Sequence, residues 1–218
     1  AAQAFAKHLS EAGITVDGEP SRAAASGGAR ELASVSSAPL SDILALSLKT
    51  SDNTMTEVEG RLVAVHAKQS ADFAGASKAV IAQLGKDGFD TSGLTLLDAS
   101  GLAKGNKVPA RLLAQILAKA AGGEGGSAGR TLIADLPVAA LDGTLTNRLH
   151  DTTAAGTVRA KTGSLERTSS LAGVVTTADG RLLAFSILAN DFPANGGGAA
   201  AAVIDSHFVA PLASCGCS

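Results

Sequence analysis

The sequence predicts an α+β fold in which helices cover an antiparallel sheet. Helical patterns dominate residues 1–121, whereas strand-like runs gather between residues 156 and 189. Asp179-Gly180 separates two of these runs, and Asp-Gly in that setting is a strong hairpin signal. Helices first and a hairpin late favour helices packed on a sheet over a repeated βαβ arrangement.

Apolar residues recur with a helical period in the first part of the chain. Residues 1–12 form one such pattern, and Gly13 ends it. Residues 31–36 alternate weakly and predict a strand. A second helix is expected to begin at residues 39–42, with Ser41 as its N-cap. Its predicted buried stripe consists of Leu40, Ile43, Leu44 and Leu48.

Two further helices are predicted next. Residues 54–57 fit a capping box, and the apolar positions that follow at i, i+4 and i+7 are Val58, Leu62 and Val65. Ser51-Asp52-Asn53 is therefore expected in a tight loop between two buried helices. The helix after these ends at Gly85, and its pattern consists of Phe73, Ser77, Val80, Ile81 and Leu84.

The rest of the chain is predicted to supply the sheet and its cover. Residues 94–97 predict a short strand, residues 98–101 a turn, and Pro109 opens a helix. A flexible loop is expected at residues 122–129. The three predicted strands of the sheet and the closing Ala-rich helix fall at residues 156–164, 171–177, 181–189 and 196–213.

Composition narrows the possible functions. The chain of 218 residues is 45% hydrophobic and 17% charged, which suits a globular domain with one sizeable core. A net charge of -2 and an aromatic content of 3% argue against a nucleic-acid partner. No apolar run approaches the roughly 18–20 residues that span a bilayer, so no transmembrane segment is predicted.

No metal or cofactor is predicted. The four histidines show no ligand spacing, and Cys215 and Cys217 are too few ligands for a metal site by themselves. A disulfide is favoured if the protein is extracytoplasmic, either between these two cysteines or with cysteines outside the chain.

Two short motifs point to chemistry. Lys161-Thr162-Gly163, followed by Ser164, ends a strand-like run and offers an ammonium, a hydroxyl and close backbone to an acidic ligand. Each motif alone has an ordinary structural explanation, since serine and asparagine favour caps and turns. Together, however, Lys161-Thr162-Gly163 and Ser51-Asp52-Asn53 indicate a serine enzyme that handles peptide or β-lactam carboxylates. The Ser-x-x-Lys nucleophile of such an enzyme does not occur in these 218 residues.

The flanks of these motifs resemble one family. The chain is similar to low-molecular-mass penicillin-binding proteins, the D-alanyl-D-alanine carboxypeptidases and endopeptidases with a large insertion in the catalytic domain. The resemblance runs from about Ala38 to Leu188, and Ala103-Lys104 departs from the more usual Ser-Arg. The strings that carry it are Asp98-Ala99-Ser100-Gly101-Leu102, Leu136-Pro137, Leu141-Asp142-Gly143-Thr144-Leu145, Val158 to Leu165 and Ser170-Leu171-Ala172-Gly173-Val174.

The resemblance implies a β-lactamase/transpeptidase-like fold, with an antiparallel sheet covered by helices on both faces. Residues 1–37 would then be the end of the inserted region and a re-entry strand, and residues 38–218 the C-terminal portion of the transpeptidase-like domain. The nucleophile would lie before Ala1, on an N-terminal part of the same protein. The implied partners are peptidoglycan stem peptides ending in D-Ala-D-Ala and β-lactam antibiotics, and the implied location is extracytoplasmic.

The resemblance also implies roles for individual residues. Ser51 would relay a proton between the catalytic lysine and the leaving amine, Asn53 would bind the substrate backbone, and Lys161 would supply positive potential and hold Ser51. Thr162 and Ser164 would bind the terminal carboxylate, and the Ser164 N–H would be an oxyanion donor. Gly163 would leave the strand open to substrate. Asp98 and Ser100 are expected to build a structural turn.

Two alternatives remain open at this stage. A class A type β-lactamase shares the motif grammar but needs a glutamate for deacylation. Glu57, Glu59 and Glu124 lie between the motifs, and none has the expected Glu-x-x-Leu-Asn setting. The other alternative is a catalytically silent binding module, because these residues include no nucleophile of the expected kind.

Overall fold

The chain divides into two compact units, Ala1–Ser37 and Ala38–Ser218, and the computed structural model describes residues 2–24 and 27–215. In the first unit, helix α1 (Ala2–Glu11) is followed by chain without regular structure. The strand expected at residues 31–36 is wrong, since Leu32 and Val35 are 84% and 96% exposed there. A strand needs a neighbour for its N–H and C=O groups, and the described part of this unit offers none. Its interpretation as the end of an inserted region stays a prediction.

The second unit begins with five α-helices. The predicted strand at residues 94–97 forms only an isolated bridge, between Thr95 and Lys107. The turn after it is connected to the helix that contains Glu57, because the Glu57 carboxylate accepts the N–H groups of Ala99 at 3.0 Å and Ser100 at 2.8 Å. The helices are α2 (Leu40–Thr50), α3 (Asn53–His66), α4 (Phe73–Lys86), α5 (Ala110–Ala121) and α6 (Gly126–Asp135).

The caps of α2 and α3 differ from the prediction. The N-cap of α3 is Asp52, whose side chain accepts the Met55 N–H at 2.8 Å, so this helix begins at Asn53. The capping box at residues 54–57 is wrong, because the Glu57 carboxylate binds the turn at residues 99–100 instead. Ser41 is not the N-cap of α2 either: Pro39 holds that position, and the Ser41 hydroxyl donates to Asp42.

The apolar pattern of α3 does not mark its buried side. Val58, Leu62 and Val65 are 49%, 52% and 57% exposed, and we call these three residues the exposed face of α3. The residues of this helix that are buried are Gly60 and Ala64. A Cβ on Gly60 would lie 2.7 Å from the Ala99 Cβ, so the helix contacts the turn through its smallest side chain. In α2, Leu40 of the predicted stripe is 54% exposed and Ser47 is buried, whereas the other stripe residues Ile43, Leu44 and Leu48 are half-buried.

Helix α6 occupies part of the region expected to be a loop. It begins at Gly126, so only residues 122–125 separate it from α5. Glycine at position 129 allows this, because a Cβ there would lie 2.9 Å from the Ala120 Cα. Close backbone approach between the two helices thus outweighs the weak helix propensity of the glycines.

A three-stranded antiparallel sheet follows, in the order β1-β2-β3. The register pairs Lys161 of β1 with Ala172 of β2, and Leu171 of β2 with Ile187 of β3. Gly180 has φ of +83° in the turn between β2 and β3, as the predicted Asp-Gly hairpin requires. The strands are β1 (Val158–Leu165), β2 (Thr168–Thr176) and β3 (Leu182–Asn190), and a short 3-10 helix η1 (Gly143–Leu145) precedes them.

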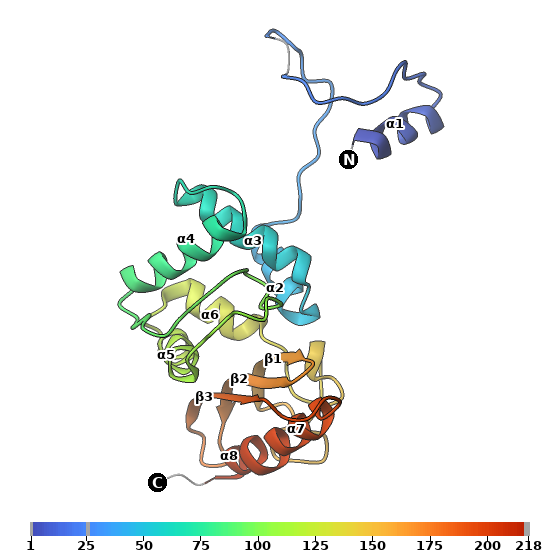
Figure 1. Cartoon of the computed structure of the whole chain (residues 1–218). Helices are drawn as coiled ribbons and strands as arrows, with labels where there is room; N and C mark the ends of the chain where they lie inside the picture. Colours follow the sequence, from blue (N-terminus) through green and yellow to red (C-terminus); the bar gives the residue numbers. More distant parts are fainter. Residues whose placement is uncertain (1, 25–26, 216–218) are drawn as a thin grey trace. The chain divides into compact units, whose positions relative to one another are not determined.

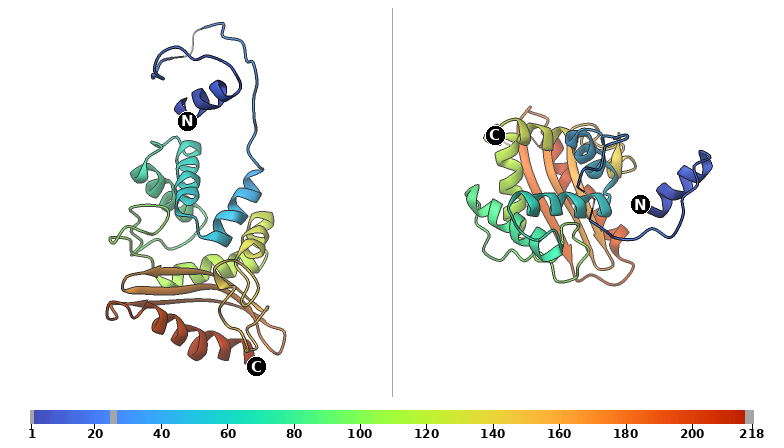
Figure 2. Two further views of the ribbon diagram at one scale, coloured as in Figure 1. Left: turned by 90° about the vertical axis from the view of Figure 1, so that its right-hand side faces the viewer. Right: turned by 90° about the horizontal axis from the view of Figure 1, so that it is seen from above.

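Helices pack against this sheet from two sides (Figures 1 and 2). Helix α5 contacts β2 and β3, while the helical segments of residues 197–214 contact β2 from the other side. The predicted mixture of helices with an antiparallel sheet is confirmed, and the closing helix is interrupted by a π-helical segment. Its three parts are α7 (Gly197–Val203), η2 (Ile204–Val209) and α8 (Ala210–Ser214).

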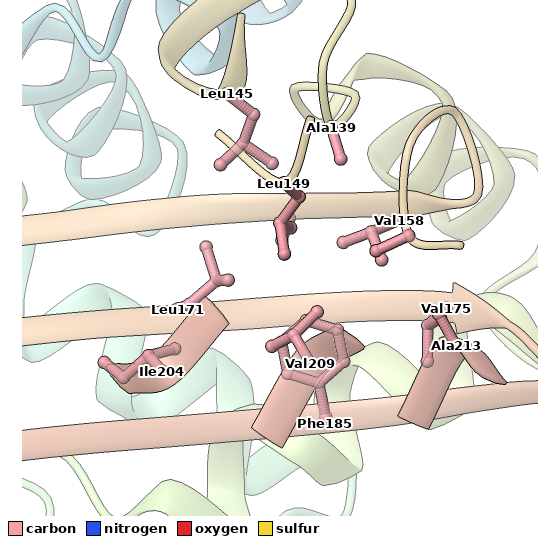
Figure 3. Close-up of a cluster of buried hydrophobic side chains, with 12 residues drawn as sticks. Ala139, Leu145, Leu149, Val158, Leu171, Val175, Phe185, Ile204, Val209 and Ala213 are labelled. Carbon is pink, nitrogen blue, oxygen red and sulfur yellow. The ribbon is translucent and has the colours of Figure 1, made fainter. Parts of the chain in front are cut away.

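The main core lies between the sheet and these C-terminal helices (Figure 3). Leu171 and Val175 of β2 are fully buried against Val209 of η2, and Leu145 of η1 closes the same cluster. Complete burial of such a side chain contributes about 1.5–3 kcal/mol. This core therefore fixes β1 and η1 with respect to each other.

Across residues 2–24 and 27–215, none of the helices combines the length and the apolar character required to cross a membrane. Cys215 takes part in a disulfide, and Cys217 lies outside the described residues.

Candidate active site

Ser51 sits in the short connection between α2 and α3. Its backbone is left-handed, with φ of 55° and ψ of 46°, and its N–H caps α2 on the Ser47 carbonyl. Asp52 is engaged as the N-cap of α3, which leaves Ser51 and Asn53 on either side of it as the available polar groups. Asn53 is exposed at the first turn of α3. The connection is shorter than predicted, because Asn53 already belongs to the helix.

Lys161 of β1 forms a hydrogen bond with Ser51, which lies 110 residues earlier in the chain. Its Nζ donates to the Ser51 Oγ at 2.6 Å and to the Thr162 carbonyl at 2.9 Å. Burial lowers the pKa of Lys161 from its ordinary value of 10.5, because the charged ammonium is poorly solvated there. A lysine with a lowered pKa gives up its proton more readily than a solvated lysine. The structure thus brings together two of the residues singled out in the sequence.

Thr162 contacts a residue that sequence reasoning did not single out. Its hydroxyl donates to the hydroxyl of Thr144 on η1 at 3.0 Å, and both threonines are half-buried. Thr144 belongs to the segment Leu141–Leu145, which was cited above only for its resemblance to a family. Nothing in the sequence of that segment indicated a role for the Thr144 hydroxyl. Ser164 is exposed two residues further along β1, so its side chain emerges on the same side as that of Thr162.

Gly163 faces the neighbouring strand. It is paired with Ser170 of β2, and a Cβ at Gly163 would collide with the Ser170 hydroxyl. Glycine is therefore required by the sheet itself at this position. Its expected role in leaving the backbone open to substrate stays a prediction.

The second half of β1 has a free edge. Its first half pairs with residues 137–139, through a Val138–Arg159 bridge and a bond from the Ala160 N–H to the Pro137 carbonyl at 2.9 Å. Beyond Ala160, no strand within the described residues pairs with β1 on that side. An extended peptide can add to such an edge through main-chain hydrogen bonds.

An ion pair links α2 to the chain around residues 137–139, which pair with the first half of β1. Lys49 donates to the Asp142 carboxylate at 2.7 and 2.9 Å and to the Leu136 carbonyl at 2.7 Å. Burial raises the pKa of the Asp142 carboxyl, but hydrogen bonds from Lys49 and the Val138 N–H outweigh it and hold the pKa below its ordinary value. Lys49 lies two residues before Ser51, and sequence reasoning gave no signal for it.

The turn at residues 98–101 is structural, as predicted. Asp98 is 7% exposed, and its carboxylate accepts from the N–H groups of Gly101 at 2.9 Å and Ala103 at 2.7 Å. The Asn106 amide donates to it as well, at 2.7 Å. Burial raises the pKa of Asp98, and these hydrogen bonds more than compensate, so the pKa is lowered.

The described part of the chain brings no three metal-ligating side chains (His, Cys, Asp or Glu) close enough to hold an ion. The site residues described above offer a hydroxyl, a lysine with a lowered pKa, a pair of threonine hydroxyls and an open strand edge.

Comparison with known proteins links this arrangement to one family. A family model described as the D-Ala-D-Ala carboxypeptidase 3 (S13) family matches residues 1–208. Carboxypeptidase DacB of Mycolicibacterium smegmatis is 43% identical over 194 residues, which cover 87% of this chain and 41% of that protein. A D-alanyl-D-alanine carboxypeptidase of Actinomadura is 36% identical over 85% of this chain and 35% of its own length.

Solved structures give the same result. Penicillin-binding protein 4 of Haemophilus influenzae, solved with a β-lactam, matches with a TM-score of 0.78 and 32% identity, over 87% of this chain and 44% of that one. The TLA-1 β-lactamase matches with a TM-score of 0.52 and 19% identity, over 70% and 55%, which shows a shared fold. The chain spans about 40% of the length of the curated relatives it matches.

Proposed function

Since the chain belongs to the D-Ala-D-Ala carboxypeptidase 3 (S13) family of serine peptidases, we propose that it supplies two walls of an active site for D-Ala-D-Ala stem peptides of peptidoglycan. The resemblance seen in the sequence is thereby confirmed at the level of the family. The observation that carries the proposal is the 2.6 Å hydrogen bond between Lys161 Nζ and Ser51 Oγ. It joins the Ser-x-Asn and Lys-Thr-Gly motifs into one polar cluster.

The proposed reaction proceeds through an acyl-enzyme. A serine outside these 218 residues attacks the carbonyl of the penultimate D-Ala and gives its proton to the lysine one helical turn later. Ser51 passes that proton to the amine of the leaving D-Ala as the peptide bond breaks. Water then hydrolyses the ester and restores the serine. Lys161 keeps the Ser51 hydroxyl oriented during both proton transfers.

The substrate's terminal carboxylate is the group that β1 recognises in this proposal. Thr162 and Ser164 present hydroxyls from the same side of the strand, and Lys161 adds positive potential beside them. The free edge of β1 beyond Ala160 binds the peptide backbone, together with the amide of Asn53. A β-lactam carries a carboxylate in an equivalent position and acylates the same serine.

An N-terminal part of the same protein, with the Ser-x-x-Lys motif, completes the site. The exposed face of α3, formed by Val58, Leu62 and Val65, supports this proposal because apolar residues at a helical spacing ordinarily face a partner. Nearby, a mostly apolar cavity of about 350 Å³ lies between α3, α4 and residues 96–108. The side-chain oxygens Glu59 Oε1 and Ser77 Oγ at this cavity have no hydrogen-bond partner within the described chain.

The proposal is tested with the complete protein that contains this chain. We expect fluorescent penicillin to label it covalently, and Lys161→Ala to lower the labelling rate by about 100-fold or more, as removal of electrostatic stabilisation does elsewhere. Absence of labelling on the intact, folded protein would refute the proposal. An extracytoplasmic location is part of it, since the substrate lies outside the cytoplasm.

A further inference from the structure

We propose that Thr144 is a positioning residue that directs the Thr162 hydroxyl toward the substrate's terminal carboxylate, and that the Lys49–Asp142 ion pair holds Thr144 in place. This inference rests on the proposed function, because it concerns recognition of the same carboxylate. Thr144 would act through Thr162 and need not touch the substrate.

The Thr144 and Thr162 side chains share a hydrogen bond between their hydroxyls. Their oxygens are 3.0 Å apart, and without substrate the Thr162 hydroxyl donates to that of Thr144. A carboxylate can only accept, which means that Thr162 must give its own proton to the substrate. When it does so, the remaining hydrogen bond between the threonines requires Thr144 to be the donor. The bound state therefore has a single order of protons, from Thr144 to Thr162 to the carboxylate.

This order of donors strengthens the hydrogen bond from Thr162 to the substrate carboxylate. A hydroxyl that accepts a hydrogen bond becomes a better donor, and chains of such bonds polarise one another. Accepting from Thr144 also removes the rotational choice that an isolated threonine hydroxyl would have. Within residues 2–24 and 27–215, no side chain forms a hydrogen bond with the Ser164 hydroxyl, which is exposed on the same strand.

The backbone around Thr144 is held from three directions. Leu145, the next residue, is fully buried in the core under β1. Asp142 is bound by Lys49 of α2 at 2.7 Å. Gly143 has φ of 56°, and a Cβ there would lie 2.7 Å from the Lys49 carbonyl, so η1 abuts the carboxyl end of α2.

These contacts connect the two walls of the site. Lys49 precedes Ser51 by two residues, and Thr144 follows Asp142 by two residues. The ion pair therefore ties the position of the Thr144 hydroxyl to the loop that carries Ser51.

The test compares ligands that differ only in their carboxylate. Rates of acylation of the complete protein would be measured with benzylpenicillin and with its methyl ester, by competition with fluorescent penicillin. We expect Thr144→Val to slow the reaction with benzylpenicillin about three- to tenfold, the size of a weakened and less oriented hydrogen bond to a charged group. The rate with the methyl ester should stay within about twofold, and Thr144→Ser should restore the wild-type ratio.

Thr146→Val is the matched control. Thr146 lies directly after η1, and its hydroxyl donates to the Gly143 carbonyl at 2.9 Å. Thr146→Val therefore removes a threonine hydroxyl next to η1, as Thr144→Val does within it. It should leave the ratio of the two rates unchanged. Lys49→Met should shift the ratio in the same direction as Thr144→Val, because it releases Asp142 and with it η1.

Two results would overturn the inference. If Thr144→Val slows both ligands equally, the residue is merely structural, and if it slows neither, the residue has no role in recognition. Both outcomes leave the proposed function intact, because the wild-type protein is still acylated. Failure of the wild-type protein to react with any β-lactam would instead refute the proposed function itself, and this inference with it.

Discussion

Arg148 and Asp205 form a partly buried ion pair, and its loss should destabilise the second unit. Arg148 lies just after η1, and its guanidinium forms two hydrogen bonds to the Asp205 carboxylate of η2, at 2.9 and 2.5 Å. The two side chains are 18% and 17% exposed. Arg148→Met would keep much of the side-chain volume and leave the carboxylate without its counter-charge.

The expected cost follows from this burial. Breaking a fully buried pair on one side costs about 3–5 kcal/mol, and the remaining solvent access of both side chains lowers the estimate to roughly 2–4 kcal/mol. For a unit of this size, that corresponds to a fall of about 5–15 °C in Tm. The double variant Arg148→Met/Asp205→Leu should recover part of the loss, since apolar replacement of a buried pair is often nearly neutral.

Urea-induced unfolding of the chain, followed by far-ultraviolet circular dichroism, provides the measurement. The sequence contains no Trp or Tyr, so intrinsic fluorescence offers no comparable signal. Arg167→Met is the control, because Arg167 is exposed and donates only to the Asp191 carbonyl at 3.2 Å. It should change the free energy of unfolding by less than about 1 kcal/mol. A loss below about 1 kcal/mol for Arg148→Met as well would refute the reasoning.

Three further predictions concern the site and its surroundings. Burial lowers the pKa of Lys161 below 10.5, so the unfolded chain binds the Lys161 proton more tightly than the folded chain does. The free energy of unfolding of the wild type, measured relative to that of Lys161→Met, should therefore rise with pH between the lowered pKa and about 10.5. If urea titrations show that this difference does not change with pH across that range, the prediction is contradicted. Gly163→Ala should destabilise the chain by about 1–3 kcal/mol, because the new Cβ would collide with the Ser170 hydroxyl. In a double-mutant cycle, the variant Gly163→Ala/Ser170→Ala should recover most of this loss. Equal stability of the single and the double variant would exclude the collision as the cause. Leu62→Glu should change the free energy of unfolding of this chain by less than about 0.5 kcal/mol, because the Leu62 side chain is 52% exposed. In the complete protein, the same substitution should lower the Tm and the penicillin labelling. If it affects the stability of this chain and of the complete protein equally, no further segment of the protein covers the exposed face of α3.

The sheet could be predicted from the sequence because its signals are local. The Asp179-Gly180 turn and the β-branched and apolar runs on either side of it set the hairpin, and the structure reproduces it within a few residues. Ser51 and Lys161 were singled out by their motifs, and the structure places them in contact.

The prediction failed where contacts between distant segments decide the structure. Glu57 satisfies a local capping pattern, but its carboxylate binds a turn 42 residues away, so Asp52 caps the helix instead. The apolar spacing of α3 marked a face that nothing within the described residues of the second unit buries. Lys49 and Thr144 carried no signal, because their importance depends on partners that only the folded chain brings near.

The contact between Lys161 and Ser51 spans 110 residues of sequence, and that between Lys49 and Asp142 spans 93. Contacts of such high sequence separation form late in folding, because the entropy of closing the intervening chain must be overcome first. Local helices and the β2–β3 hairpin can form well before either contact exists. The lysine–serine pair therefore reports on the last stage of folding, and a partly folded chain would present both motifs without the geometry that joins them.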